Sequence, residues 1–169
     1  MPSCRILTAS HTSELVLDLA TKARWVIECE PYRVLFPKVK LRNDQNAKGY
    51  YANTLGGDRY TCTVAGKSPM GFHAHACIVD DPIDPKKAVS EVELRTARDF
   101  FDTVLPSRVV DKNVSVMFLI MQRLHDVDPT GHLLKKARIE GATKIRHICI
   151  PASIFHGIFQ PAIPYTFNR

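Results

Sequence analysis

The segment Val114–Met121 constrains the fold of this chain more than any other segment. Apart from Ser115, it is the longest apolar run in the sequence, and it is well short of the roughly 18 apolar residues that suggest a membrane span. Its length suits a buried strand instead. Strands that are apolar throughout are typical of the centre of a parallel sheet, where both faces are covered. We therefore expect Val114–Met121 to be a central strand of such a sheet.

Predicted strands and helices alternate along much of the chain. Apolar spacing and capping residues predict further strands at Arg5–Ala9, Ala76–Val79 and Ile145–Ile150, and helices at about 12–28, 90–104 and 128–140. Either Ser10 or Thr12 is expected to cap the first helix. The segment Ser90-Glu91-Val92-Glu93 fits a capping box, and Asp128 before Pro129 fits an N-cap followed by proline at the first helical position.

The segment Val39–Val64 has a different character. It is rich in Tyr, Thr, Val and Asn, and Gly56-Gly57 lies between two candidate strands, which predicts a β-hairpin. The alternation and the hairpin together predict an α/β domain over residues 1–152, with a largely parallel sheet and an inserted β-hairpin. Residues 153–169 show no periodicity and are expected to form an irregular tail.

Composition and charge exclude some classes of protein. Hydrophobic residues make up 45% of the 169 residues, which excludes wholesale disorder. Lys and Arg number 23 against 17 Asp and Glu, and the net charge of +6 favours approach to polyanions such as nucleic acids. The first residues lack the basic-then-apolar layout of a signal peptide. We therefore expect a cytoplasmic protein without a membrane partner.

The strongest local signal for chemistry is the apolar strand Ala76–Val79 followed by Asp80 and Asp81. In an open α/β sheet the ligand crevice lies beyond the carboxyl ends of the strands. A first carboxylate there can hold Mg²⁺ at the phosphates of a nucleotide, and a second can orient or deprotonate the attacking water. This is the form of a Walker B motif. The alternative interpretation is a strand that simply ends in an Asp-Pro turn at Pro82.

Three other features admit a functional and a structural interpretation. Gln122, at the end of the apolar strand, can sense a γ-phosphate or simply terminate the strand. Gly66-Lys67-Ser68 copies the end of a phosphate-binding loop, but Thr61 stands where GxxxxGK[ST] needs glycine. His73 and His75 lie upstream of Asp80 and have the spacing that places two side chains on one face of a strand, which suits either a metal site or polar packing in a loop.

Several of these segments, in this order, resemble the large subunit of tailed-phage terminase, the DNA-packaging motor. The matching stretches are Glu30–Pro37, Asp44-Gln45-Asn46, Asn53–Gly57, Ile78–Pro82, Ser90–Glu93, Met121–Leu133 and Ile148–Ala152. The run QRLH, two acids and then TGHL is quite specific to that family. The resemblance covers about residues 4–152, and it implies a partial P-loop NTPase (RecA-like) domain.

The resemblance also implies roles for particular residues. Asp80 would be the Walker B magnesium ligand and Asp81 the catalytic carboxylate. The residues Gln122, Arg123, Leu124 and His125 would lie in the motif that couples hydrolysis to DNA movement. In the complete protein, Mg²⁺ and ATP serve an ATPase that drives double-stranded DNA into a procapsid, together with other terminase subunits and the portal. The implied location is the cytoplasm of a bacterial host, with the gene encoded by a phage or prophage.

The chain also departs from the family pattern. The resemblance begins after the family's Walker A loop and ends before its nuclease domain, so we expect no cofactor-binding residues from a Walker A loop in this sequence. Many members have Gly-Arg before Walker B, where this chain has Gly71-Phe72. Without the amides and lysine of a phosphate loop, the phosphate charge is uncompensated. We therefore expect this chain alone to hydrolyse ATP very slowly or not at all, and one side of its sheet to be uncovered with an aggregation-prone edge.

Two other functions remain open at this stage. The first is a non-enzymatic accessory protein that binds DNA or other terminase subunits, which the positive net charge favours. The second is a small metal-dependent hydrolase built on His73, His75, Asp80 and Asp81.

Overall fold

The computed structural model describes residues 2–66, 69–139 and 144–150. The chain divides into two compact units, Met1–His132 and Leu133–Arg169. The expected tail at residues 153–169 lies outside the described residues, and so does Lys67 of the loop-like Gly66-Lys67-Ser68.

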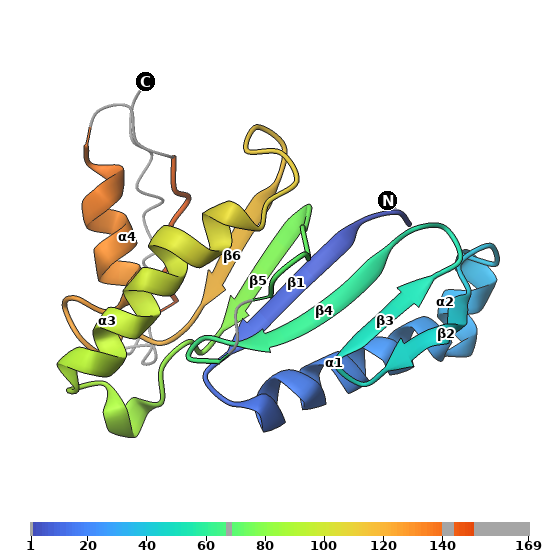
Figure 1. The fold of residues 1–169 in the computed structure, drawn as a ribbon, viewed down its shortest axis with the longest axis horizontal. Coiled ribbons are helices and arrows are strands. Elements are labelled where there is room, and N and C mark those ends of the chain that lie inside the picture. The colour runs from blue at the N-terminus through green and yellow to red at the C-terminus, as the bar shows by residue number, and fades with distance from the viewer. Residues whose placement is uncertain (1, 67–68, 140–143, 151–169) are drawn as a thin grey trace, which may run out of the picture. The chain divides into compact units, whose positions relative to one another are not determined.

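The first unit is built on a sheet that mixes parallel and antiparallel strands. Its strands are β1 (Arg5–Ser10), β2 (Leu41–Ala47), β3 (Tyr50–Asn53), β4 (Asp58–Thr63), β5 (Ala76–Asp80) and β6 (Val116–Ile120). They lie in the order β2-β3-β4-β1-β5-β6 (Figure 1). The pairs β4–β1, β1–β5 and β5–β6 are parallel, and the two pairs that involve β3 are antiparallel. The predicted α/β class with a mostly parallel sheet is therefore confirmed.

Four α-helices accompany the described strands. They are α1 (Ser13–Glu28), α2 (Glu30–Leu35), α3 (Glu91–Asp99) and α4 (Pro129–Ala137). Thr12 caps α1, since its hydroxyl accepts the N–H of Leu15 at 3.2 Å. The helices α1 and α3 lie on opposite faces of the sheet (Figure 1). The fully buried side chains include Leu7, Val79, Leu94 and Leu105, each of which stabilises the fold by about 1.5–3 kcal/mol relative to an exposed position.

The predicted helix over residues 90–104 is only partly correct. α3 ends at Asp99 and continues as a π-helical turn over Phe100–Val104. The capping box is wrong, because Ser90 makes no side-chain cap. Its N–H donates to the carbonyl oxygen of Lys87 at 2.9 Å, and the Glu93 carboxylate pairs with the Lys87 ammonium at 3.4 Å. The Ser90 N–H and the Glu93 carboxylate, which would bond to each other in a capping box, are therefore both engaged with Lys87.

The predicted hairpin is confirmed as β3 and β4, and β2 extends it into a third antiparallel strand. Two glycines make its turn possible. Gly56 has a φ of +86°, which L residues rarely adopt. A Cβ on Gly57 would lie 2.2 Å from the carbonyl oxygen of Pro2, so the close approach of the chain's beginning to this turn excludes a side chain there.

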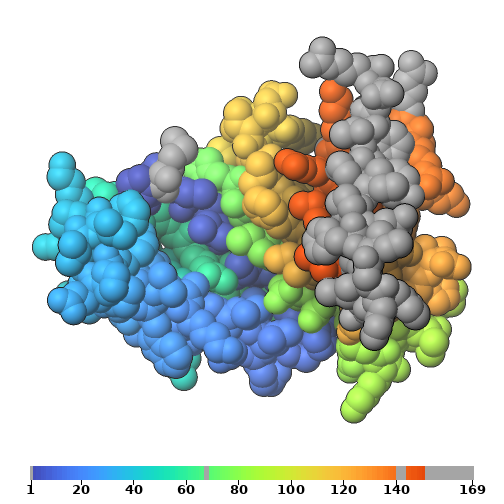
Figure 2. All heavy atoms as spheres, turned by 180° about the vertical axis from the view of Figure 1, so that it is seen from behind, coloured from blue at the N-terminus to red at the C-terminus, as the bar shows by residue number. Residues whose placement is uncertain are grey.

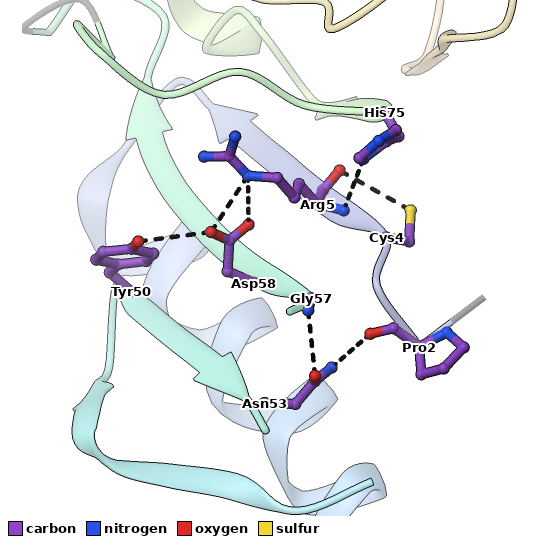
Figure 3. A network of polar contacts seen from close by, with 8 residues as sticks. All are labelled: Pro2, Cys4, Arg5, Tyr50, Asn53, Gly57, Asp58 and His75. Atoms are coloured by element: carbon purple, nitrogen blue, oxygen red, sulfur yellow. Dashed lines mark hydrogen bonds and ion pairs between the residues drawn. The ribbon is translucent and has the colours of Figure 1, made fainter. Parts of the chain in front are cut away.

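A network of polar contacts fixes the amino end of β1 (Figure 3). The Arg5 guanidinium pairs with Asp58 on β4 at 3.2 Å, and Asp58 also accepts from the Tyr50 hydroxyl at 3.5 Å. The N–H of Arg5 donates to Nδ1 of His75 at 3.1 Å. Nδ1 of His75 is therefore an acceptor that is already engaged, and the network pins β1 between β4 and the start of β5.

The apolar segment at 114–121 forms β6, but the expected central position is wrong. β6 is the edge strand of the described sheet, and side chains on both of its faces are exposed, with Phe118 at 52% and Met117 at 45%. Continuous apolarity indicates that a strand needs covering, but it does not say which segment covers it. The expectation of an uncovered side of the sheet agrees with β6.

The predicted strand Ile145–Ile150 is also not observed. These residues have no regular secondary structure in the second unit, and Ile148 and Ile150 are exposed at 69% and 86%. A strand requires a neighbour for its backbone hydrogen bonds, and no strand pairs with this segment among the described residues. Across residues 2–66, 69–139 and 144–150, no helix has the length and apolarity needed to cross a membrane.

Candidate functional site

The candidate site lies where three parallel strands end side by side. Asp80 is the last residue of β5, which runs between β1 and β6. The preceding Cys77 and Val79 are fully buried, so β5 is firmly held up to its carboxyl end. In open α/β sheets, ligands bind beyond this edge. The local apolar pattern and the two following carboxylates correctly located the end of β5.

Asp81 adopts an unusual backbone conformation directly after β5. Its φ is +43°, in the left-handed region that Asp tolerates better than most residues. Its N–H donates to the carbonyl oxygen of Ile120 on β6 at 2.9 Å, and its own carbonyl oxygen accepts from the N–H of His11 at 3.1 Å. The ends of both neighbouring strands therefore hold Asp81 in place.

Asp80 carries a perturbed carboxylate. Partial burial raises the pKa of Asp80 above its ordinary value, and the negative charge of Asp81 raises this pKa further. A divalent cation would relieve both effects, because carboxylate oxygens are the ligands that Mg²⁺ prefers. The described residues contain no cluster of three or more His, Cys, Asp or Glu suited to a metal ion. The pair therefore fits Mg²⁺ only where water or phosphate oxygens supply the other ligands, as is usual for this ion.

A pocket of about 210 Å³ lies on the sheet face that α1 partly covers. Its lining residues are Thr8, Ala9, Val16, Leu19, Arg59, Ile78, Asp80 and Ile120. Figure 2 shows this face, where α1 covers only part of the sheet and atoms of β1, β4, β5 and β6 remain visible beyond it. Sites for drug-sized ligands usually span about 300–1,000 Å³, so this pocket alone is too small to enclose a nucleotide.

Within this pocket, Arg59 is the one basic residue among the lining side chains. Its Nε donates to the Thr8 hydroxyl at 3.4 Å. The sequence analysis did not single out Arg59, because its position in the pocket with Asp80 depends on the pairing of β4 with β1 and of β1 with β5.

The predicted coupling residues Gln122, Arg123, Leu124 and His125 follow β6 without regular secondary structure. Because Ile120 pairs in register with Asp80, the segment begins beside the carboxyl end of β5. Gln122 is exposed. The structure thus brings this segment to the same sheet edge as Asp80, and its coupling role stays a prediction.

Asp128 organises the segment after β6. Its carboxylate is fully buried and pairs with Arg123 Nε at 3.0 Å. It also accepts the N–H groups of Leu124 at 3.0 Å, His125 at 3.3 Å and Gly131 at 2.8 Å. The contact with Gly131 confirms the predicted N-cap of α4. The contacts with the other three residues were missed, because the Asp-Pro signal indicates only the start of a helix.

These contacts also set the ionisation of Asp128. Burial alone would raise its pKa, but the hydrogen bonds from Gly131, Leu124, Arg123 and His125 together outweigh burial and hold the pKa below its ordinary value. Asp128 is therefore a negative charge that the fold stabilises, whereas Asp80 is a negative charge that the fold disfavours.

The residues of the proposed metal-dependent hydrolase do not come together. His75 precedes β5, and Asp80 ends it, so the two lie at opposite ends of a five-residue strand. Nδ1 of His75 is also engaged with the N–H of Arg5. The spacing of His73 and His75 predicts two side chains on one face of a strand, but β5 begins only at Ala76.

Comparison with known proteins clarifies the fold. No family model matches the chain, and no curated protein matches it. Among solved structures, the crystal structure of the HK97 bacteriophage large terminase matches with a TM-score of 0.54 and 16% sequence identity, over 79% of this chain and 26% of that chain. The chain has a terminase-like fold. It spans about a quarter of the HK97 large terminase chain, and at this identity the likeness concerns the fold alone.

Proposed function

We propose that this chain is a part of a phage DNA-packaging ATPase that carries the Walker B carboxylates and the coupling segment. The observation that carries the proposal is the position of Asp80 and Asp81 at the carboxyl end of β5, between two parallel strands of a terminase-like fold. In the complete protein, hydrolysis of ATP would be coupled to translocation of double-stranded DNA.

The proposed roles follow from the chemistry of each side chain. Asp80 would hold Mg²⁺, which neutralises phosphate charge when it is bound. Asp81 would orient the attacking water and accept its proton. Arg123, Leu124 and His125 are tied to the buried carboxylate of Asp128, so a displacement at the end of β6 would be passed to α4.

In this proposal, another protein segment supplies the phosphate-binding loop. The sequence has no complete GxxxxGK[ST], and the pocket beside Asp80 is too small to enclose a nucleotide. β6 supports the proposal, since it is the outermost strand of the described sheet and has exposed apolar side chains where a further strand can pair. If such a strand runs parallel to β6, the loop that follows it would lie beyond the carboxyl ends of the strands, on the same side of the sheet as Asp80.

The test begins with the nucleotide sequence upstream of the Met1 codon, translated in all frames. A strand followed by GxxxxGK[ST] is expected there. ATP hydrolysis is then measured for the purified chain alone and for the chain co-expressed with that segment. We expect turnover only with both parts, and its loss in Asp81→Asn. Robust turnover by the chain alone would overturn the need for a second segment, and unchanged turnover in Asp81→Asn would overturn the role of Asp81.

A DNA-binding accessory protein is the second candidate function, favoured by the net charge of +6. It predicts that the chain binds duplex DNA with an affinity that falls steeply with salt and does not respond to ATP. Fluorescence anisotropy with a labelled duplex at several salt concentrations, with and without Mg²⁺ and ATP, separates the two functions. A nucleotide-dependent affinity supports the motor ATPase instead.

A further inference from the structure

Two residues at the carboxyl end of β1 converge on a single oxygen atom beyond β5. The carbonyl oxygen of Asp81 accepts the N–H of His11 at 3.1 Å and lies 2.7 Å from Nδ1 of the same residue. The hydroxyl of the fully buried Ser10 donates to this oxygen at 3.4 Å. A carbonyl oxygen has two lone pairs, yet three donor groups from the end of a neighbouring strand face this one. That is more than ordinary strand pairing provides.

The contact with His11 also fixes the tautomer of the ring. A carbonyl oxygen can only accept a hydrogen bond, so Nδ1 of His11 must carry a proton. In the neutral imidazole, Nε2 is then unprotonated. This state has a distinct spectroscopic signature, which makes the contact measurable in solution.

The contacts of Ser10 and His11 with the Asp81 carbonyl oxygen, here called the clamp, act on a residue whose backbone is strained. Asp81 has a φ of +43°, and such conformations persist in residues other than glycine when the surrounding structure over-determines them. The N–H of Asp81 is bound to Ile120 of β6, and its carbonyl oxygen is bound to Ser10 and His11 of the β1 end. The peptide groups on both sides of the Asp81 Cα are thus held, which sets the direction in which its carboxylate leaves the backbone.

The geometry points to His11, assisted by Ser10, as a positioning residue for the Asp81 carboxylate. Its link to ATP hydrolysis rests on the proposed function, whereas the clamp itself does not. His11 acts through the Asp81 backbone and needs no contact with a phosphate. Because Ser10 ends β1, His11 follows it directly and Ile120 ends β6, the carboxylate is aligned by both strands that flank β5.

The first experiment measures the clamp on the full 169-residue chain by NMR. Wild-type His11 is expected to show the Nδ1-protonated tautomer in long-range ¹H–¹⁵N spectra. In His11→Ala, the Asp81 HN–Hα coupling and Cα shift, which report φ, should leave their left-handed values. In His11→Asn, the side-chain amide replaces the Nδ1 donor and should restore them. His73→Ala, an exposed histidine at the opposite end of β5, is the matched control.

The Nε2-protonated tautomer in the wild type, or an unchanged Asp81 signal in His11→Ala, would overturn the inference. The second measurement uses the assembled, ATP-hydrolysing complex, where His11→Ala should lower kcat by roughly 100-fold with little change in KM, and His11→Asn should recover most of it. Unchanged kcat in His11→Ala would overturn the positioning role. Absence of turnover in every variant, with the NMR signature intact, would count against the proposed function and leave the clamp established.

Discussion

β5 and β6 are neighbouring parallel strands of similar apolar composition, yet only β5 has buried side chains. Val79 of β5 is 1% exposed, whereas Phe118 and Ile120 of β6 are 52% and 57% exposed. β5 has a paired strand on each side, whereas β6 pairs only with β5 among the residues that the structure describes. The difference shows that side chains of the first unit are well packed around β5 and exposed at β6. The candidate carboxylates follow the packed strand, and the candidate coupling residues follow the exposed one.

The largest expected effect comes from placing a charge in each strand. It tests whether the difference in burial between β5 and β6 is also a difference in their contribution to the free energy of unfolding. Val79→Asp would bury an unpaired charge beside the packed side chains of the core, and we expect it to reduce the free energy of unfolding by more than about 4 kcal/mol. The matched Phe118→Asp in β6 should cost less than about 1 kcal/mol, because its side chain already contacts water. Urea denaturation followed by circular dichroism measures both.

Equal losses in the two variants would contradict the exposure of β6. They would indicate that in solution another surface, such as a second copy of the chain, covers this strand. Phe118→Asp should also reduce any concentration-dependent self-association, which sedimentation velocity detects, since a charge blocks edge-to-edge pairing.

Local signals predicted the covered strand better than the uncovered one. The apolar run before Asp80, the Thr12 cap and the Asp128 cap each depend on residues close in sequence, and all three are present in the structure. The coverage of β6 depends on segments far away in sequence, so apolarity alone predicted a central strand. Ser90 shows the same limit on a smaller scale, because its N–H and the Glu93 carboxylate are both engaged with Lys87 instead of with each other.

The site was predicted in part for the same reason. Asp80 and Asp81 were found because strand and carboxylates are contiguous in the sequence. The contacts of His11 with Asp81 join residues that are 70 positions apart in the sequence, and no local pattern predicts them. Arg59 reaches the pocket only through the order of the strands. Local sequence therefore identified the candidate carboxylates, whereas topology determines what holds them.

The next effect in size concerns the carboxylate that follows β6. Asp128→Asn removes the charge that pairs with Arg123 and weakens the bonds to Leu124, His125 and Gly131. We expect a loss of about 1–3 kcal/mol in the free energy of unfolding at pH 7. Because the pKa of Asp128 is lowered in the folded state, its contribution is present above the unfolded pKa of about 3.9 and is lost as the pH falls through the lower folded value.

Urea denaturation of the wild type and Asp128→Asn between pH 7 and pH 3 measures this dependence. The difference between the two proteins should shrink as the pH approaches the acid end. A difference that stays constant would show that Asp128 acts by shape and hydrogen bonding alone, with no contribution from its charge.

The carboxylate that ends β5 should behave in the opposite way. The pKa of Asp80 is raised by burial and by Asp81, so the folded state disfavours its charge. Its ionisation costs stability at neutral pH, and this cost disappears as the pH falls below the unfolded pKa. Asp80→Asn should therefore raise the thermal midpoint slightly at pH 7, by an amount that vanishes in acid. A lower midpoint at pH 7 would show that the Asp80 charge has a stabilising partner in the folded protein.

The mildest perturbation compares the reactivity of two thiols at paired positions. Cys77 of β5 pairs in register with Met117 of β6. Burial raises the pKa of Cys77 from 9.0 to about 11, so its thiolate fraction at pH 8 falls roughly 100-fold. In Met117→Cys, the new thiol replaces a side chain that is 45% exposed and should be alkylated by iodoacetamide much faster than Cys77. Site-resolved mass spectrometry gives both rates in one sample, with the exposed Cys29 as an internal standard. Because the substitution changes neither charge nor core packing, slow alkylation at position 117 would mean that another surface covers β6 in solution, and it would contradict the difference in exposure between the two strands.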